Sequence, residues 1–378
     1  MKFLRTLTLC AIYGLITIIV LISGMAIYKY QTTPEKIRPV PFSIPDNLYL
    51  QNEVAEQSDI LIIGDDFAID FNDQVEKLIE NLSKGLKKPI SIYNYASQNE
   101  AIYRTIEKVK SLKSLPSIII YMGGTSEFAE DIYPKNINNF WMNFKRYQND
   151  YLNTLIMISP SLSRLIYQRD KKQELTNEIA PFKYEGDLWY QRVSEATYYI
   201  YQDYLRDLID LIQERKSLPV IVTPSVNLLA QVKRACDNSI IDNITITQNE
   251  IKVLMDENKF KDAYGKIVAL DKTAIGNART KFLRGKVEFE LGKFKDAKES
   301  LTFSKALECS PPKSSVIINS IQKKMALEKN IDIIKFDELI NDNFGKDVLF
   351  IDEEKPQFIY WEKLLSRLTK KLQGLLDL

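Results

Sequence analysis

Histidine is absent from this 378-residue chain, and cysteine is scarce, with only three residues. Without an imidazole the protein lacks the usual general base that activates a hydroxyl nucleophile near neutral pH. Cys236 and Cys309 could pair outside the cytoplasm, but two cysteines do not make a disulfide framework, so free thiols are the simpler expectation. A surplus of charge is also missing, because 51 basic residues face 50 acidic ones. This balance argues against nucleic acid as a partner.

A long apolar segment lies at the amino terminus. Lys2 and Arg5 precede an uncharged run over residues 6–28, about the length needed to cross a bilayer. Gly24 and Ala26 could mark a cleavage site, but the run is long for a cleaved signal peptide. We therefore expect a single-pass transmembrane anchor over residues 1–30. Because the amino-terminal charges lie closest to the span, the bulk of the chain is expected outside the cytoplasm, in the periplasm of a bacterial cell envelope.

The segment after the anchor, residues 31–57, contains four prolines and reads as an extended spacer. Beyond it, short apolar runs rich in β-branched residues alternate with amphipathic stretches of helical length, which indicates a parallel sheet covered on both faces. The expected fold is α/β, a flavodoxin-like three-layer α/β/α sandwich in which ligands bind beyond the carboxyl ends of the strands. The five predicted strands are 59–64, 89–96, 117–124, 218–225 and 331–339.

A repeat interrupts this pattern. The pentapeptide KFKDA occurs at Lys259–Ala263 and again, 34 residues later, at Lys293–Ala297. The period and the helical patterning resemble a tetratricopeptide repeat. We expect helical hairpins over 245–310 that pack on the α/β body, whose two parts are 58–244 and 311–378. A further helical insertion is expected at about 132–215.

That further insertion is rich in aromatic residues over 186–216. Such rings could stack on sugars or lie near lipid headgroups. The simpler interpretation is a helix that covers the sheet and places its aromatic side chains in the core. The residues concerned are Trp189, Tyr190, Tyr198, Tyr199, Tyr201 and Tyr204.

The strand ends carry four short motifs in a fixed order: GDD at 64–66, NYA at 94–96, GGTSE at 123–127 and FIDEEKP at 350–356. Over residues 58–370 this order resembles the four blocks of the SGNH, or GDSL, hydrolase family. The inserted repeat resembles that of a subgroup of bacterial SGNH proteins that carry tetratricopeptide repeats. The resemblance implies an SGNH-like fold and an ester-hydrolysing ancestry.

The first two blocks depart from the family pattern. In the family the first block ends in a serine nucleophile, and the matching position here is Asp66. The second block provides a glycine amide to the oxyanion hole, and Ala96 stands there after Asn94. The backbone N–H of Ala96 could retain part of the anion site.

The last two blocks depart as well. The third block keeps Gly124 but has Ser126 where the resemblance implies an asparagine that donates to the oxyanion. The fourth keeps Asp352 but has Lys355 where the family has its histidine base. A lysine beside acidic residues stays protonated, and a carboxylate at position 66 is a poor nucleophile toward an ester. The sequence thus predicts a vestigial pocket with no intact catalytic residue, closed by an ion pair between Asp66 and Lys355.

Two other kinds of chemistry stay open at this point. An aspartate after a strand can be phosphorylated, and Asp65, Asp66, Asp352 and Glu354 could collect a divalent cation. Alternatively, Ser97 or Ser126 could work with Lys355 as a Ser–Lys pair. We expect neither, and no metal or cofactor.

Together these observations predict a membrane-anchored, extracytoplasmic SGNH-like protein that is catalytically inactive and acts in binding or assembly at the cell envelope. The alternative is an active esterase or acyltransferase with non-standard catalytic residues. Expected partners are the membrane, a protein bound through the helical hairpins, and a glycan or acyl ligand suggested by family analogy.

Overall fold

The computed structural model describes residues 2–32, 42–43, 51–130, 137–149, 151–152, 155–156, 166, 173–174, 187–235, 242–274, 276–309, 311 and 313–377. Contacts divide the chain into two compact units, residues 1–45 with 133–175 and residues 46–132 with 176–378. Most of the predicted spacer and part of the predicted 132–215 insertion lie outside the described residues. The rest of that insertion is divided, because residues 187–214 belong to the second unit.

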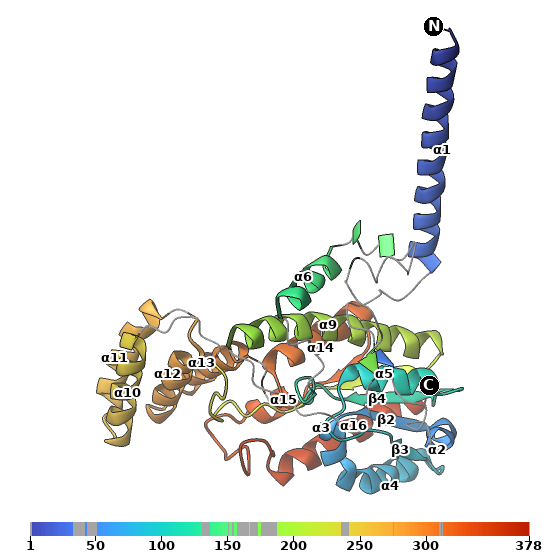
Figure 1. Cartoon of the computed structure of the whole chain (residues 1–378). Coiled ribbons are helices and arrows are strands. Elements are labelled where there is room, and N and C mark those ends of the chain that lie inside the picture. Colours follow the sequence, from blue (N-terminus) through green and yellow to red (C-terminus); the bar gives the residue numbers. More distant parts are fainter. Residues whose placement is uncertain are drawn as a thin grey trace. The chain divides into compact units, whose positions relative to one another are not determined.

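The first unit contains the apolar helix α1 (Lys2–Thr32), helix α6 (Ile137–Tyr147), and the short parallel pair β1 (Phe42–Ser43) and β5 (Gln173–Glu174) (Figure 1). Within α1, the window Thr8–Met25 has a mean hydropathy of 2.2. That length and composition suffice for a membrane span, and a signal sequence has the same properties.

The second unit is built on a five-stranded, all-parallel sheet. Its order is β3-β2-β4-β6-β7, which is 2-1-3-4-5 when the strands are counted along the chain. This is the flavodoxin-like order. The five predicted strands are confirmed, with shorter bounds: β2 (Ile60–Gly64), β3 (Ile92–Asn94), β4 (Ile118–Met122), β6 (Leu218–Val222) and β7 (Asp332–Ile334). The prediction is wrong for residues 336–339 of the fifth strand, which are helical.

Helices cover both faces of this sheet (Figure 1). On one face lie α4 (Val75–Leu86) and α16 (Phe358–Leu376), which pack together; on the other lie α5 (Ile102–Ser111), α9 (Asp187–Glu214) and α14 (Val316–Lys329). The central strands β2 and β4 are buried on both faces and contain no charged residue. Ile60 and Ile62, for example, join Leu78 of α4 and Leu364 of α16 in one apolar cluster. A short helix, α2 (Asn52–Gln57), precedes β2.

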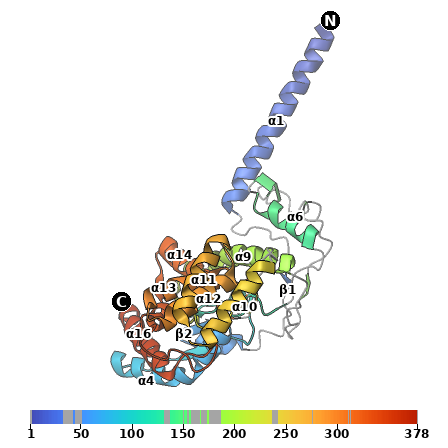
Figure 2. The same cartoon turned by 90° about the vertical axis from the view of Figure 1, so that its left-hand side faces the viewer.

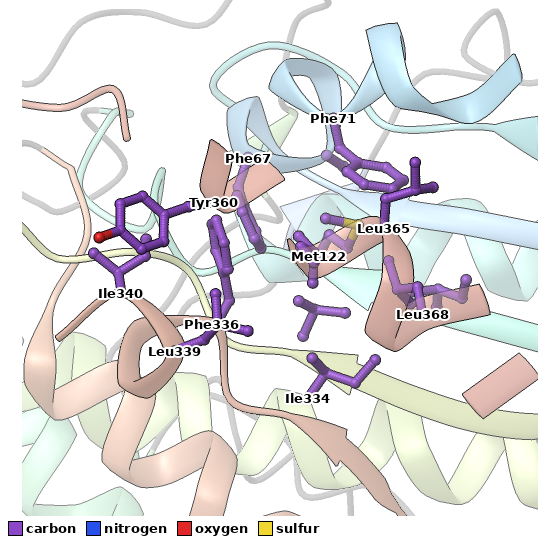
Figure 3. Packing of buried hydrophobic residues seen from close by; sticks show 14 of the residues in the cluster. Phe67, Phe71, Met122, Ile334, Phe336, Leu339, Ile340, Tyr360, Leu365 and Leu368 are labelled. Atoms are coloured by element: carbon purple, nitrogen blue, oxygen red, sulfur yellow. The ribbon is translucent and has the colours of Figure 1, made fainter. Parts of the chain in front are cut away.

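Aromatic rings fill the α4 and α16 side of the core near the carboxyl ends of the strands (Figure 3). Phe67 of α3 (Asp66–Asp70) stacks on Phe336 of α15 (Phe336–Asn341), with ring centroids 5.8 Å apart. Trp361 lies 5.8 Å from Phe67 and 5.2 Å from Phe336. This packing fixes the position of α3, the helix that begins directly after β2.

The aromatic residues of α9 are mostly core residues. Trp189, Tyr190, Tyr201 and Tyr204 are all at least nine-tenths buried. The simpler interpretation of this helix, a cover for the sheet, is confirmed for these four side chains.

Two helical hairpins follow β6: α10 (Asp242–Asp256) with α11 (Phe260–Thr273), and α12 (Ala278–Glu290) with α13 (Phe294–Ala306). The KFKDA copies occupy equivalent positions, at the start of the second helix of each hairpin. Asn258 and Gly292, also 34 residues apart, both have left-handed backbone with φ 59° and 71°. Lys259 and Lys293 cap the next helices with nearly identical φ of −85° and −84°. The repeat is therefore structural, while its assignment to the tetratricopeptide family stays a prediction.

The second hairpin packs on the sheet unit. Ala297 and Leu301 of α13 are fully buried members of the same apolar cluster as the strands. The first hairpin instead packs on the second: Ile251 of α10 and Ile267 of α11 form a separate cluster with Val287 of α12.

Cysteine behaves differently from expectation. Cys309, which follows α13, is disulfide-bonded, and Cys10 is free. Cys236 lies outside the described residues. The expectation of free thiols is therefore wrong for Cys309.

Candidate functional site

The candidate site lies where strand order reverses, between β2 and its neighbour β4. In doubly wound sheets ligands bind beyond the carboxyl ends of the strands at this switch point. Here the ends are the turn Gly64–Asp66 and the turn 123–126. Gly64 has φ +140°, and a Cβ at this position would lie 2.0 Å from the carbonyl oxygen of Met122. Only glycine permits this close approach of the two turns.

Asp65 joins the two turns from inside. One carboxylate oxygen accepts the backbone N–H groups of Gly124, Thr125 and Ser126, at 2.9, 2.6 and 2.9 Å. The other accepts the N–H of Phe67 at 3.1 Å and so caps α3. Asp65 is therefore the N-cap residue of α3.

Asp65 is fully buried, and burial raises its pKa to about 6, although the hydrogen bonds from backbone N–H groups act in the opposite direction. Its four backbone hydrogen bonds and complete burial leave it no access to a ligand. Asp65 is therefore a positioning residue for the site rather than a reacting one.

Asp66, at the nucleophile position of the resemblance, faces the other way. Its carboxylate accepts the Ser126 hydroxyl at 3.1 Å and the backbone N–H of Asn99 at 3.3 Å. The Nζ of Lys313 lies 3.4 Å away, and its side chain is 41% exposed. The predicted ion pair between Asp66 and Lys355 is wrong, because Lys313 is the cation that contacts Asp66. At this exposure the pair contributes roughly 1 kcal/mol or less.

Lys355, which does not pair with Asp66, lies in a loop over residues 350–356 that is held by its own hydrogen bonds. Phe350 and Pro356 pair as an isolated bridge, and the N–H of Ile351 donates to the carbonyl of Lys355. Asp352 is exposed, and one of its oxygens accepts the N–H groups of Glu354 and Lys355 at 2.7 and 2.6 Å. These two bonds hold the pKa of Asp352 below its usual range. Asp352 thus orders its own loop.

The second block does not leave an open anion donor. The N–H of Ala96 donates to the side-chain oxygen of Asn94 at 3.2 Å. The amide nitrogen of Asn94 in turn donates to the carbonyl of Ala68 at 2.8 Å. The predicted remnant of an oxyanion hole at Ala96 is therefore occupied from within the protein.

The third block has a close-packed glycine. Gly124 has φ +101°, and a Cβ there would lie 2.6 Å from a methyl carbon of Ile318. Below it, Gln322 donates to the carbonyl of Gly123 and to the Tyr201 hydroxyl, each at 2.8 Å. This turn is fixed by α14 and α9 as well as by Asp65.

The Ser–Lys alternative is not supported by the geometry. The Ser97 hydroxyl accepts from the buried Lys108, whose Nζ also pairs with Glu100 at 2.7 Å. The Ser126 hydroxyl donates to Asp66. Neither serine contacts Lys355.

The metal alternative also lacks a preformed site. Among the described residues, no three His, Cys, Asp or Glu side chains are grouped so that they could hold a metal ion.

A cavity of about 100 Å³ opens beside Asp66. It is smaller than ordinary ligand pockets of about 300–1,000 Å³ and suits the end of a ligand rather than a whole lipid chain. Asp70 lies on its wall, and desolvation raises the pKa of its carboxyl group. The other charged residues that line the cavity are Asp66, Lys233, Lys305, Glu308, Lys313, Glu353 and Glu354.

Two residues of the site, Lys313 and Glu127, were not predicted from the sequence. Lys313 lies two residues before Ser315, whose hydroxyl caps α14 by accepting the N–H of Ile317 at 3.2 Å. The segment PPKSS over 311–315 signals this helix start, and it marks the return of the chain to the sheet unit after the repeat. Glu127, directly after Ser126, is buried and accepts the N–H of Ile102 at 3.1 Å.

Glu127 makes stability depend on pH. Burial, with the nearby Asp65, raises the pKa of Glu127 well above its usual range. The folded protein thus holds this proton to higher pH than the unfolded chain does, so ionisation favours unfolding. As pH rises from about 4.3 through the folded pKa, this group should lower the free energy of unfolding by up to about 1.4 kcal/mol per unit.

Glu127→Gln should remove this contribution, because glutamine resembles the protonated acid and does not titrate. Urea denaturation at about pH 5 and about pH 8 should show a smaller loss of stability in the variant than in the wild type. Glu299→Gln, the same change at an exposed position of α13, should follow the wild type. Equal pH slopes in all three proteins would contradict the assignment.

No protein-family model matches the chain, and no curated protein matches it. Among solved structures, the lipase/acylhydrolase from Enterococcus faecalis matches with 9% identity and a TM-score of 0.35, over 83% of this chain and 95% of that one. A structure assigned as an acylhydrolase from Bacteroides fragilis matches with 8% identity and a TM-score of 0.36, over 86% and 95%. At these values the two structures do not identify the activity of this chain.

Proposed function

We propose that this chain is a membrane-anchored protein in which an SGNH-like pocket has lost catalysis and serves binding or assembly at the cell envelope. One observation carries the proposal. The position of the nucleophile is held by Asp66, whose carboxylate is engaged by Ser126, Asn99 and Lys313, in a chain without histidine. The histidine that in the SGNH family takes a proton from an attacking alcohol and returns it to a leaving group is absent from the sequence.

Two features support an extracytoplasmic location. Helix α1 is apolar over Thr8–Met25, which fits an uncleaved anchor. Cys309 is disulfide-bonded, and disulfides persist mainly in oxidising compartments such as the periplasm. In this proposal α1 spans the membrane once and the sheet unit lies outside the cytoplasm.

The hairpins support a protein partner. Helical repeats with a 34-residue period resemble tetratricopeptide repeats, and stacked repeats commonly offer a concave binding surface. A glycan or acyl ligand for the cavity rests on family analogy alone.

Ester hydrolysis tests the loss of catalysis. Full-length protein in non-ionic detergent micelles should cleave p-nitrophenyl acetate no faster than the micelles alone, because a working general base typically contributes about 10²–10⁴-fold. An active SGNH esterase in the same micelles is the positive control. Turnover above background that disappears in Asp66→Ala or Ser126→Ala would refute the proposal and favour an esterase with non-standard residues.

A further inference from the structure

A groove of about 540 Å³ separates the first helices of the two hairpins from the loop that follows β6. Figure 2 shows the helices α10 to α13 side by side on this side of the second unit. Helix α10 contributes Lys252 and Asn249, α12 contributes Arg279 and Phe282, and the loop contributes Gln231 and Lys233. The groove therefore lies on the surface shared by the repeat and the sheet unit.

The charge in this groove is unbalanced. Lys252 and Arg279 are exposed, and in the part of the chain that the structure describes neither makes an ion pair. The acid that lines the groove is Glu353, and it is already paired with Lys233 at 3.0 Å. Two cations thus face the groove without a partner, although the whole chain is nearly neutral. A ligand that supplies carboxylates would complement them.

The rest of the lining suits an extended polypeptide. Phe282 is partly exposed and provides apolar surface, and the exposed amides of Gln231 and Asn249 offer both donors and acceptors, as the main chain of a peptide does. Gln248 cannot contribute its N–H groups so readily, because it donates to Asn277 and Thr280 at 3.0 and 2.9 Å. Apolar pockets beside main-chain partners are the usual means of recognising a peptide in an extended conformation.

The groove also adjoins the cavity beside Asp66. Gln231, Lys233 and Glu353 line both spaces. The ion pair between Lys233 and Glu353 therefore lies at the junction of the hairpin groove with the switch-point cavity. A ligand carboxylate that reaches this junction competes with Glu353 for Lys233.

We propose that this groove binds an extended, acidic segment of a partner protein, with Lys252 and Arg279 pairing with its carboxylates and Phe282 contacting its apolar side chains. Lys233 exchanges Glu353 for a carboxylate of the partner at the inner end. This proposal rests on the proposed binding role of the chain and names the class of partner.

Fluorescence anisotropy with full-length protein in non-ionic micelles tests it. The probe is a short fluorescein-labelled peptide that alternates Glu and Leu, with a Lys–Leu peptide of equal length as its control. Lys252→Glu and Arg279→Glu should each weaken binding of the acidic peptide by about tenfold or more, since one ionic contact of about 1.4 kcal/mol is lost. Lys272→Glu, the same charge reversal on α11 outside the groove, should change binding by less than about twofold.

Glu353→Gln provides a test in the opposite direction. It frees Lys233 from its internal partner, so binding of the acidic peptide should tighten. A Kd that is the same in wild type, Lys252→Glu and Arg279→Glu would overturn the proposal, and so would the absence of binding. Displacement by polyphosphate at a lower concentration than by the unlabelled peptide would also overturn it, because the groove would then bind an anionic polymer.

These results are independent of ester hydrolysis. If the protein binds the acidic peptide and also hydrolyses p-nitrophenyl acetate, the proposal for the groove is supported and the proposed loss of catalysis is refuted. If the protein neither hydrolyses the ester nor binds the peptide, only the proposal for the groove is refuted.

Discussion

Asp65→Ala should lower the free energy of unfolding by about 3–5 kcal/mol, the effect of leaving several buried donors unpaired. The substitution removes the acceptor of four backbone N–H groups, three in the turn after β4 and one at the start of α3. Part of this loss is offset, because the wild type must bury a carboxyl whose pKa is raised to about 6. The donors outweigh that offset, since no water reaches a site that is fully buried.

Urea denaturation of the full-length protein in non-ionic micelles at constant pH measures this effect, with tryptophan fluorescence as the probe. Asp66→Ala is the matched control, because its partners lie at 3.1–3.4 Å and its side chain is 22% exposed. That variant should lose about 1 kcal/mol or less. Equal losses for the two aspartates would show that Asp65 does not hold the turns together.

Arg104→Ala should cost a similar amount, about 3–5 kcal/mol, because it strands a buried carboxylate. Arg104 binds Glu130 with two nitrogens, Nη2 to Oε1 at 2.6 Å and Nε to Oε2 at 3.1 Å, and the Tyr103 hydroxyl donates to the same carboxylate. The Arg104 and Glu130 side chains are 4% and 6% exposed. Bidentate geometry makes the pair strong, and its burial makes a missing partner costly.

The same denaturation measurement separates this pair from surface charge pairs. Lys84 and Glu80 form an ion pair with side chains that are 72% and 60% exposed, so Lys84→Ala should cost less than about 0.5 kcal/mol. The double variant Arg104→Met with Glu130→Met should recover most of the loss, because it removes both charges from the interior. A loss for Arg104→Ala no larger than that for Lys84→Ala would contradict the assignment.

The sheet could be predicted because its signal is local. The strands β2, β4 and β6 are short runs rich in β-branched residues and bounded by turn-formers, and their burial on both faces excludes charged residues. The strand bounds were harder to predict. The expected strand 89–96 begins at Pro89, which cannot donate to a ladder, and in the structure β3 covers only Ile92–Asn94.

The position of the candidate site could be predicted from the sequence, but the contacts between its side chains could not. Its position follows from strand order, and Asp66 and Ser126 do meet there. The partner of Asp66 could not be predicted, because Lys313 is 247 residues away in the sequence and enters only where the chain returns from the repeat. The sequence also does not predict that Asp65 is buried between the turns while Asp66 faces the cavity, because this depends on the backbone conformation at Gly64.

The two hairpins pack differently on the rest of the protein, and this difference limits where repeat units can be gained or lost during evolution. Leu301 and Ala297 belong to the same apolar cluster as the strands, so a gene deletion that removed α13 would expose this cluster to solvent and destabilise the protein. The hairpin of α10 and α11 packs on Leu283 and Val287 of α12 and contributes no described residue to the cluster that contains the strands, so duplication or loss of repeat units is tolerated best there. Related lineages should therefore differ in length before Ala278 and stay constant after it.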